Sequence, residues 1–271
     1  MGIALFGLAI AASAAAVALG RQSHQVDESI RSVALSGTAH ALVVLPDGYA
    51  SSGKHYPVIY FLHGLPAGPS TYRNSAWLGD MLERVGPAIL VMPQGARADD
   101  TDPEYLNWGV GRNWETFVSE ELPAVIDKRF RTIPARNGRA LIGLSAGGFG
   151  ATVLGLHNLG RFSVVESWSG YFHPTDPTGT RALARGPLTS AHNLISVLKL
   201  DERHRPTFFG FYVGDGDSRF LAENLQLNRE LNQAHVKHLF VVYSGGHSTT
   251  LWESHARVWL GLALAHLAHA A

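Results

Sequence analysis

Short apolar runs alternate with longer segments of helical periodicity along most of the chain, and this alternation constrains the fold more than any other feature. Helices between strands carry the chain from one parallel strand to the next. The pattern therefore predicts an α/β fold with a largely parallel central sheet and helices on both of its faces. Strands are predicted at 57–62, 87–92, 139–144, 162–168, 207–213 and 237–243, and helices at 114–130 (kinked at Pro123), 146–159, 191–200, 219–234 and 251–268.

The first part of the chain differs in composition from the rest. Residues 2–20 carry no charge and are mostly Ala, Leu, Ile and Val, so we expect residues 1–20 to be a signal peptide or a membrane anchor. An ordinary buried helix is the alternative. The polar residues 21–32 are predicted to be a linker, and residues 32–45 an opening antiparallel hairpin. The folded domain is thus expected over 33–271, in a secreted or extracytoplasmic, membrane-anchored protein.

Charge and cysteine content exclude several classes of function. Lys plus Arg number 22 and Asp plus Glu number 22, so the chain lacks the positive footprint of a nucleic-acid-binding protein. The sequence contains no cysteine, which removes thiolate metal sites and a cysteine nucleophile. Neither an H-E-x-x-H metal motif, a dinucleotide glycine fingerprint nor a Walker loop is present. We expect no metal and no cofactor.

One glycine-rich motif has the context that nucleophilic catalysis requires. Gly143-Leu144-Ser145-Ala146-Gly147 is a G-x-S-x-G sequence, preceded by a predicted strand and followed by a small-residue helix. A serine on such a sharp strand-to-helix turn exposes its hydroxyl, and the flanking glycines allow neighbouring chain to approach closely. The amide of Ala146 would then lie at a helix N-terminus, where it can stabilise an oxyanion. A glycine-rich turn that only packs tightly is the alternative.

A serine hydroxyl needs a base, and the end of the chain supplies a candidate. His247 follows the last predicted strand in a glycine-flanked loop, at the sheet edge where open α/β sheets bind ligands. Asp215 and Asp217 follow the preceding strand, and either carboxylate could orient the imidazole. We favour Asp217, because Gly216 gives the backbone freedom to bring it toward the histidine loop. The order Ser, Asp, His is that of the α/β hydrolases.

Three other segments are candidate parts of the site. The run Phe61-Leu62-His63-Gly64-Leu65 follows a strand, and the Leu65 amide is the candidate for a second oxyanion donor. Two long irregular stretches, 95–113 and 170–206, could overhang an active site or be surface elaborations. Candidate substrate-binding residues are His63, Trp108, Trp114, Tyr171 and Phe172, although aromatic residues also commonly fill a core.

With these residues in place, the chain resembles the esterase D-like branch of the α/β hydrolases over most of 33–265. That branch includes S-formylglutathione hydrolases, feruloyl esterases and secreted mycolyltransferases. The resemblance rests on 63–65, 114–117, 121–123, 143–148, 169–172, Gly214 with Asp217, and 246–247. It implies the α/β-hydrolase fold, a triad of Ser145, Asp217 and His247, and oxyanion amides from Leu65 and Ala146.

The resemblance implies a catalytic domain that acts on a small-molecule or cell-envelope ester. Mycolyltransferases carry an acidic residue at the position of His63 and a glutamate as the triad acid. These departures favour hydrolysis. Acyl transfer to a sugar or alcohol is the alternative that uses the same acyl-enzyme. A non-catalytic binding or cell-wall protein of this fold is the alternative from another class. No nucleic acid is expected as a partner, and membrane association is expected only through residues 1–20.

Overall fold

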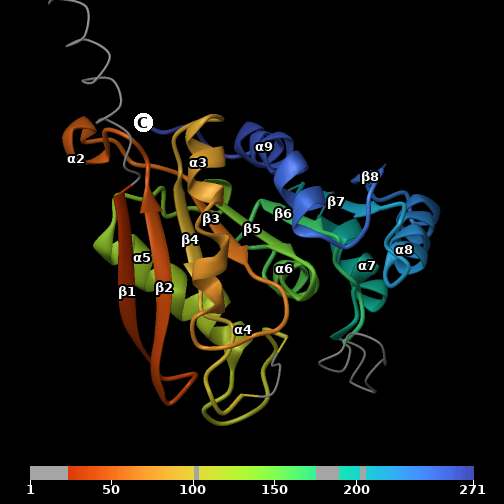
Figure 1. Ribbon diagram of the computed structural model, residues 1–271, viewed down its shortest axis with the longest axis horizontal. Helices are drawn as coiled ribbons and strands as arrows, with labels where there is room; N and C mark the ends of the chain where they lie inside the picture. Colours follow the sequence, from red (N-terminus) through yellow and green to blue (C-terminus); the bar gives the residue numbers. More distant parts are fainter. Residues whose placement is uncertain (1–23, 101–103, 175–188, 202–205) are drawn as a thin grey trace, which may run out of the picture.

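The computed structural model describes residues 24–100, 104–174, 189–201 and 206–271, and one eight-stranded sheet organises them (Figure 1). The strand order is β1-β2-β4-β3-β5-β6-β7-β8. Strand β2 is antiparallel to both neighbours, and the pairs from β4 through β8 are parallel. This is the α/β-hydrolase fold that the sequence predicts. The strands are β1 His24–Ser32, β2 Gly37–Leu45, β3 Val58–Leu62, β4 Ile89–Pro93, β5 Arg139–Leu144, β6 Val164–Trp168, β7 Phe208–Gly214 and β8 Leu239–Tyr243.

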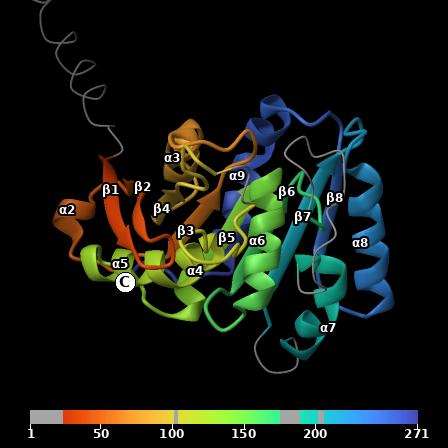
Figure 2. The same cartoon turned by 90° about the horizontal axis from the view of Figure 1, so that it is seen from below.

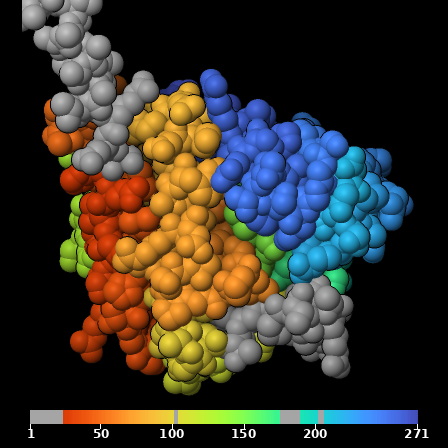
Figure 3. Space-filling model, viewed as in Figure 1, coloured from red at the N-terminus to blue at the C-terminus, as the bar shows by residue number. Residues whose placement is uncertain are grey.

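Helices cover both faces of the sheet, as Figure 2 shows in the view along the layers. Helices α3 and α9 pack on one face, whereas α4, α5, α6, α7 and α8 pack on the other. On the surface seen in Figure 3, the segment that carries α3 lies beside α9. The helices are α2 Tyr49–Ser52, α3 Leu78–Glu83, α4 Trp114–Thr116, α5 Leu122–Arg129, α6 Ala146–His157, α7 Ala191–Asp201, α8 Leu221–Gln233 and α9 Thr249–Ala265, with short 3-10 helices at Thr71–Ser75 and Arg136–Gly138.

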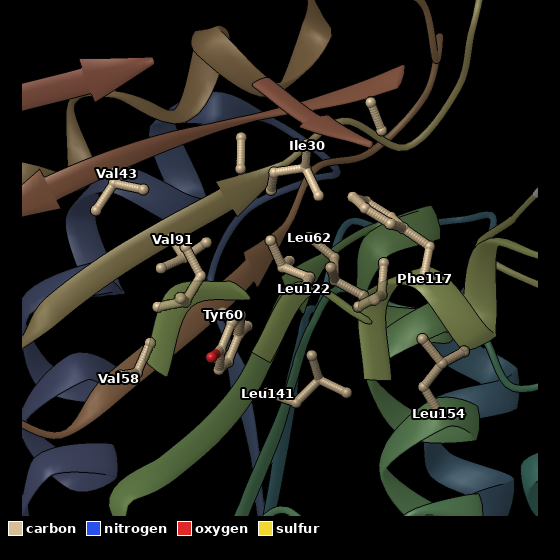
Figure 4. Packing of buried hydrophobic residues seen from close by; sticks show 14 of the residues in the cluster. Ile30, Val43, Val58, Tyr60, Leu62, Val91, Phe117, Leu122, Leu141 and Leu154 are labelled. Atoms are coloured by element: carbon tan, nitrogen blue, oxygen red, sulfur yellow. The ribbon is translucent and has the colours of Figure 1, made fainter. Parts of the chain in front are cut away.

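The central strands are buried on both faces, which explains why they are continuous apolar runs in the sequence. All five residues of β3 are buried. Tyr60 and Leu62 pack toward Phe117 and Leu122 of the α4–α5 region (Figure 4), and Phe61 points to the opposite layer with α9. Successive side chains of a strand point to opposite faces, so each central strand contributes to both hydrophobic layers and fixes the loops that follow it.

The linker predicted over 21–32 is wrong where the structure describes it. Residues 24–32 form β1, which pairs with β2 along its whole length, from His24 opposite Leu45 to Ser32 opposite Gly37. The predicted hairpin therefore begins earlier than residue 32. Strand β1 is polar because it lies at the sheet edge, where only the inward positions Ile30 and Ser32 are buried. Polar composition alone did not distinguish such an edge strand from a linker.

The predicted helix at 114–130 consists of three consecutive segments, two α-helical and one π-helical. A π-helical turn, Phe117–Glu121, joins α4 to α5, and Pro123 lies in the first turn of α5. The helical run continues through this point, since the Leu122 amide donates to the Phe117 carbonyl, and the wider π-helical turn lies where a proline interrupts the regular hydrogen-bond pattern. The irregular geometry thus precedes the proline that was expected to kink the helix.

The predicted signal peptide or anchor at 1–20 lies outside the described residues. Among the helices that the structure describes, none is long and apolar enough to cross a membrane.

Candidate active site

Ser145 lies on a sharp turn between β5 and α6. Its backbone has φ 53° and ψ −121°, a conformation that costs a non-glycine residue about 1–3 kcal/mol and that clusters at functional sites. Tight packing holds this turn in place. A Cβ atom at Gly147 would lie 2.0 Å from the carbonyl oxygen of Leu62, so only glycine lets α6 start this close to β3. The residues around Ser145 therefore enforce its strained geometry.

His247 brings the end of the chain to this turn. Its Nε2 atom lies 2.9 Å from Ser145 Oγ, and its Nδ1 atom lies 2.7 Å from Asp217 Oδ2. Ionised carboxylates only accept hydrogen bonds, so Nδ1–H donates to Asp217 and Nε2 is left to accept the serine proton. The three side chains follow the carboxyl ends of β5, β7 and β8, which lie at one edge of the sheet. The structure thus brings together the three residues proposed from the sequence.

The two candidate carboxylates, Asp215 and Asp217, have different surroundings. The Asp217 side chain is fully buried, and its Oδ1 accepts hydrogen bonds of 3.2 Å from the amides of Arg219 and Phe220. These amides fix the carboxylate while Oδ2 faces His247. Asp215 Oδ1 instead accepts from the Gly245 amide at 2.9 Å. Asp215 therefore ties the two loops together, whereas Asp217 holds the imidazole.

The two amides predicted to bind an oxyanion belong to Ala146 and Leu65, one next to Ser145 in the chain and one in the lining of its cavity. Ala146 is the first residue of α6, and the first amides of a helix have no acceptor within it. Gly64 packs against the serine so closely that a Cβ atom there would lie 2.9 Å from Ser145 Cβ. The following residue, Leu65, lines the same cavity as the serine. The segments that carry the two candidate donors thus both border Ser145.

A cavity of about 360 Å³ opens above the serine. His63 and Tyr171 line it, as predicted for substrate-binding residues. No sequence motif pointed to Trp77 and Trp252, which come from the α3 and α9 side, or to Arg219. The described residues that line the cavity are His63, Gly64, Leu65, Pro66, Thr71, Asn74, Ser75, Trp77, Leu144, Ser145, Tyr171, Arg219, His247, Thr249 and Trp252.

Three aromatic residues predicted to bind substrate do not line this cavity. Trp114 is fully buried beside Phe117, and its indole nitrogen donates to Asp100. Phe172 is also fully buried and packs edge-on against Phe211. Trp108 is 45% exposed on the described part of the 95–113 loop. Trp114 and Phe172 are therefore core residues and Trp108 a surface residue, a difference that residue type alone does not reveal.

His63 is a buried histidine at the cavity wall. Its Nδ1–H donates to the Gly64 carbonyl at 2.8 Å, and its Nε2 is buried without a partner among the described residues. Burial lowers the pKa of His63 to about 4, although the bond to Gly64 opposes this effect. The imidazole is therefore neutral near pH 7, and it adds no charge beside Ser145. Among the described residues, no group of three His, Asp or Glu side chains could hold a metal ion.

The sheet topology and the serine turn define an α/β hydrolase. The chain belongs to the esterase family described as "Putative esterase", whose model matches residues 32–258. Esterase Rv1288 of Mycobacterium tuberculosis is 39% identical over 129 residues, which are 47% of this chain and 28% of that protein. The MPT51/MPB51 antigen of the same organism is 31% identical over 145 residues, or 52% of this chain and 46% of the antigen. The matches thus span less than half of either relative.

A solved structure supports the same fold assignment over nearly the whole chain. A ferulic acid esterase superposes with a TM-score of 0.75 and 25% identity, covering 89% of this chain and 97% of that one.

Proposed function

We propose that this protein is a serine esterase that hydrolyses carboxylic esters through an acyl-enzyme on Ser145. One observation carries the proposal: Asp217, His247 and Ser145 form a continuous chain of hydrogen bonds that ends at a cavity of about 360 Å³. A hydroxyl that is hydrogen-bonded to an oriented imidazole is an activated nucleophile. Membership of the esterase family supports the same chemistry.

Each residue has a defined part in the proposed reaction. Ser145 Oγ attacks the ester carbonyl while His247 Nε2 takes the hydroxyl proton, and Asp217 stabilises the imidazolium that forms. The amides of Leu65 and Ala146 hold the negative oxygen of the tetrahedral intermediate. His247 then gives its proton to the departing alcohol, which leaves the acyl group on Ser145. Water attacks this acyl-enzyme in the second half of the reaction, with His247 again as the base.

A fluorophosphonate probe tests the nucleophile directly, because it forms a covalent bond with an activated serine. We expect wild-type protein to be labelled and Ser145→Ala to be unlabelled. Ser75→Ala is the matched control, since Ser75 lines the same cavity and is buried. Labelling that persists in Ser145→Ala would reject the assignment, and a wild-type protein that reacts with neither probe nor ester would favour a non-catalytic role.

Hydrolysis and acyl transfer share the acyl-enzyme and differ in the acceptor. We propose hydrolysis, because the departure from the mycolyltransferase pattern at His63 removes one of the features that would support transfer. Product analysis with p-nitrophenyl butyrate and an added sugar distinguishes the two. Predominant acylation of the sugar at a modest concentration would reverse the proposal. We also propose that residues 1–20 direct export of the protein and that the catalytic domain follows them.

A further inference from the structure

Two consecutive residues that contact the lining of the cavity, Glu104 and Tyr105, have an unusual backbone conformation. Their φ angles are 46° and 60°, in the left-handed region that larger side chains rarely adopt. Both residues are also buried, with 2% and 3% of their surfaces exposed. Two adjacent residues hold such a conformation only when their surroundings fix it, and positions of this kind cluster at functional sites.

Tyr105 joins the two segments that flank the serine. Its hydroxyl donates a hydrogen bond of 2.9 Å to the carbonyl oxygen of His63, two residues before the Leu65 amide. Its ring also meets the His63 imidazole edge-on, with 5.7 Å between centroids. On its other side the ring packs on α6, since a Cβ atom at Gly150 would lie 2.7 Å from it. Tyr105 thus lies between the oxyanion loop and the helix that begins after Ser145.

Glu104 holds the opposite part of the cavity wall. Its Oε1 accepts a hydrogen bond of 2.8 Å from the Tyr171 hydroxyl, and Tyr171 lines the cavity. The Tyr171 ring is stacked on Phe149 and tilted against Phe220, with centroid separations of 5.1 Å and 5.0 Å. A buried carboxylate is costly unless it is hydrogen-bonded. The bond from Tyr171 therefore ties the buried Glu104 side chain to the cavity wall.

We propose that Glu104 and Tyr105 are positioning residues for ester hydrolysis: Tyr105 fixes the oxyanion loop through the His63 carbonyl, and Glu104 fixes the cavity wall through Tyr171. The inference rests on the proposed function and names two residues that neither touch substrate nor belong to the triad. Because the two residues are adjacent, one backbone conformation sets both the oxyanion loop and the wall that an acyl or alcohol group would touch.

The role of Tyr105 in fixing the oxyanion loop is tested with Tyr105→Phe, which keeps the ring and removes only the hydroxyl. Tyr56→Phe is the matched control, because Tyr56 is equally buried and its hydroxyl bonds Ser52, in a region that does not line the cavity. An oxyanion donor is worth two to three powers of ten in kcat, and Tyr105 acts one step behind it. We therefore expect kcat for p-nitrophenyl acetate to fall about tenfold with KM within about twofold of wild type.

Phenylboronic acid separates positioning from a general loss of stability. It forms a tetrahedral adduct with an active-site serine, so its inhibition constant reports on the oxyanion loop. We expect this constant to rise about tenfold in Tyr105→Phe, with melting temperatures similar in Tyr105→Phe and Tyr56→Phe. An unchanged kcat, an unchanged boronate constant, or an equal kcat loss in Tyr56→Phe would overturn the proposal for Tyr105.

The role of Glu104 in holding the cavity wall is tested with Glu104→Met, which removes the carboxylate that accepts from the Tyr171 hydroxyl and leaves Tyr171 itself intact. Here KM for p-nitrophenyl butyrate should rise several-fold while kcat and the boronate constant stay within about twofold. A kcat loss as large as that of Tyr105→Phe, or an unchanged KM, would overturn the assignment of Glu104. Labelling of all variants with the fluorophosphonate gives the active fraction. If wild type itself is not labelled, the proposed esterase function has failed instead of the positioning roles.

Discussion

The two sides of the cavity are held in place by different means. On the His247 side, the loops after β7 and β8 touch main chain to main chain. A Cβ atom at Gly214 would lie 2.1 Å from the Gly245 carbonyl, and the Gly216 amide donates to that carbonyl at 2.8 Å. On the His63 side, the Tyr105 hydroxyl bonds the main-chain carbonyl. The first side should therefore be sensitive to added atoms, and the second to removed hydroxyl groups.

The largest effect is expected from the carboxylate that orients His247. Asp217→Asn should lower kcat by about 10⁴, the loss seen when the corresponding aspartate of the serine-protease triad is replaced and the imidazole takes the wrong tautomer. Asp215→Asn is the matched comparison, since this residue only accepts a bond from the Gly245 amide. It should stay within about tenfold of wild type. Steady-state kinetics on proteins shown to be folded by circular dichroism decides between them, and the reverse ranking would move the acid to Asp215.

A smaller but still large effect is expected where the two loops touch. Gly214→Ala forces the loop that carries Asp217 away from the loop that carries His247. The new methyl group would meet the main chain of Gly245, which cannot turn aside as a flexible side chain could. A misplacement of about 1 Å costs about 10² in kcat, and we expect a lowered melting temperature as well. Gly261→Ala is the control, because its new methyl group would meet Val85 at an ordinary 3.4 Å. Full activity in Gly214→Ala would show that this side is less rigid than the contact implies.

Local patterns in the sequence were sufficient for the fold, and they marked three residues that the structure brings together. Each buried strand is a short apolar run, and Ser145 and His247 are marked by glycines directly after strands. Edge strand β1 was missed because only Ile30 and Ser32 are buried there, so the apolar alternation of a strand is absent from most of it. The short helix α3 was missed because Leu78–Glu83 is too brief to show a periodicity.

The cavity wall was harder to predict, because it is assembled from segments far apart in the chain. Trp77 and Trp252 face the cavity, whereas Trp114 is enclosed in the core. Residue type does not separate the three. Trp77 and Trp252 pack with the α3 and α9 layer, whereas Trp114 packs with Phe117 in the layer on the other face of the sheet. The same holds for Glu104 and Tyr105, whose backbone conformation has no local motif in the sequence.

The smallest expected effect concerns stability on the His63 side. Burial lowers the pKa of His63 from its usual 6.5 to about 4. Between these two pH values the histidine is protonated in the unfolded chain and neutral in the folded protein, so lowering the pH favours unfolding. The free energy of unfolding is therefore unaffected by this histidine above pH 6.5. It falls as the pH is lowered from 6.5 toward 4, and below pH 4 His63 causes no further change. Between pH 7 and pH 5 it should reduce the free energy of unfolding by about 2 kcal/mol.

His63→Asn isolates this contribution, because an asparagine amide can still donate to the Gly64 carbonyl but does not titrate. Urea unfolding at pH 7 and at pH 5 should show a loss of stability that is about 2 kcal/mol smaller in the variant than in wild type. The other histidines titrate in both proteins, so their effects cancel in this difference. Equal losses in the two proteins would mean that water or movement of the oxyanion loop relieves the burial of His63. The His63 side would then be the more flexible of the two.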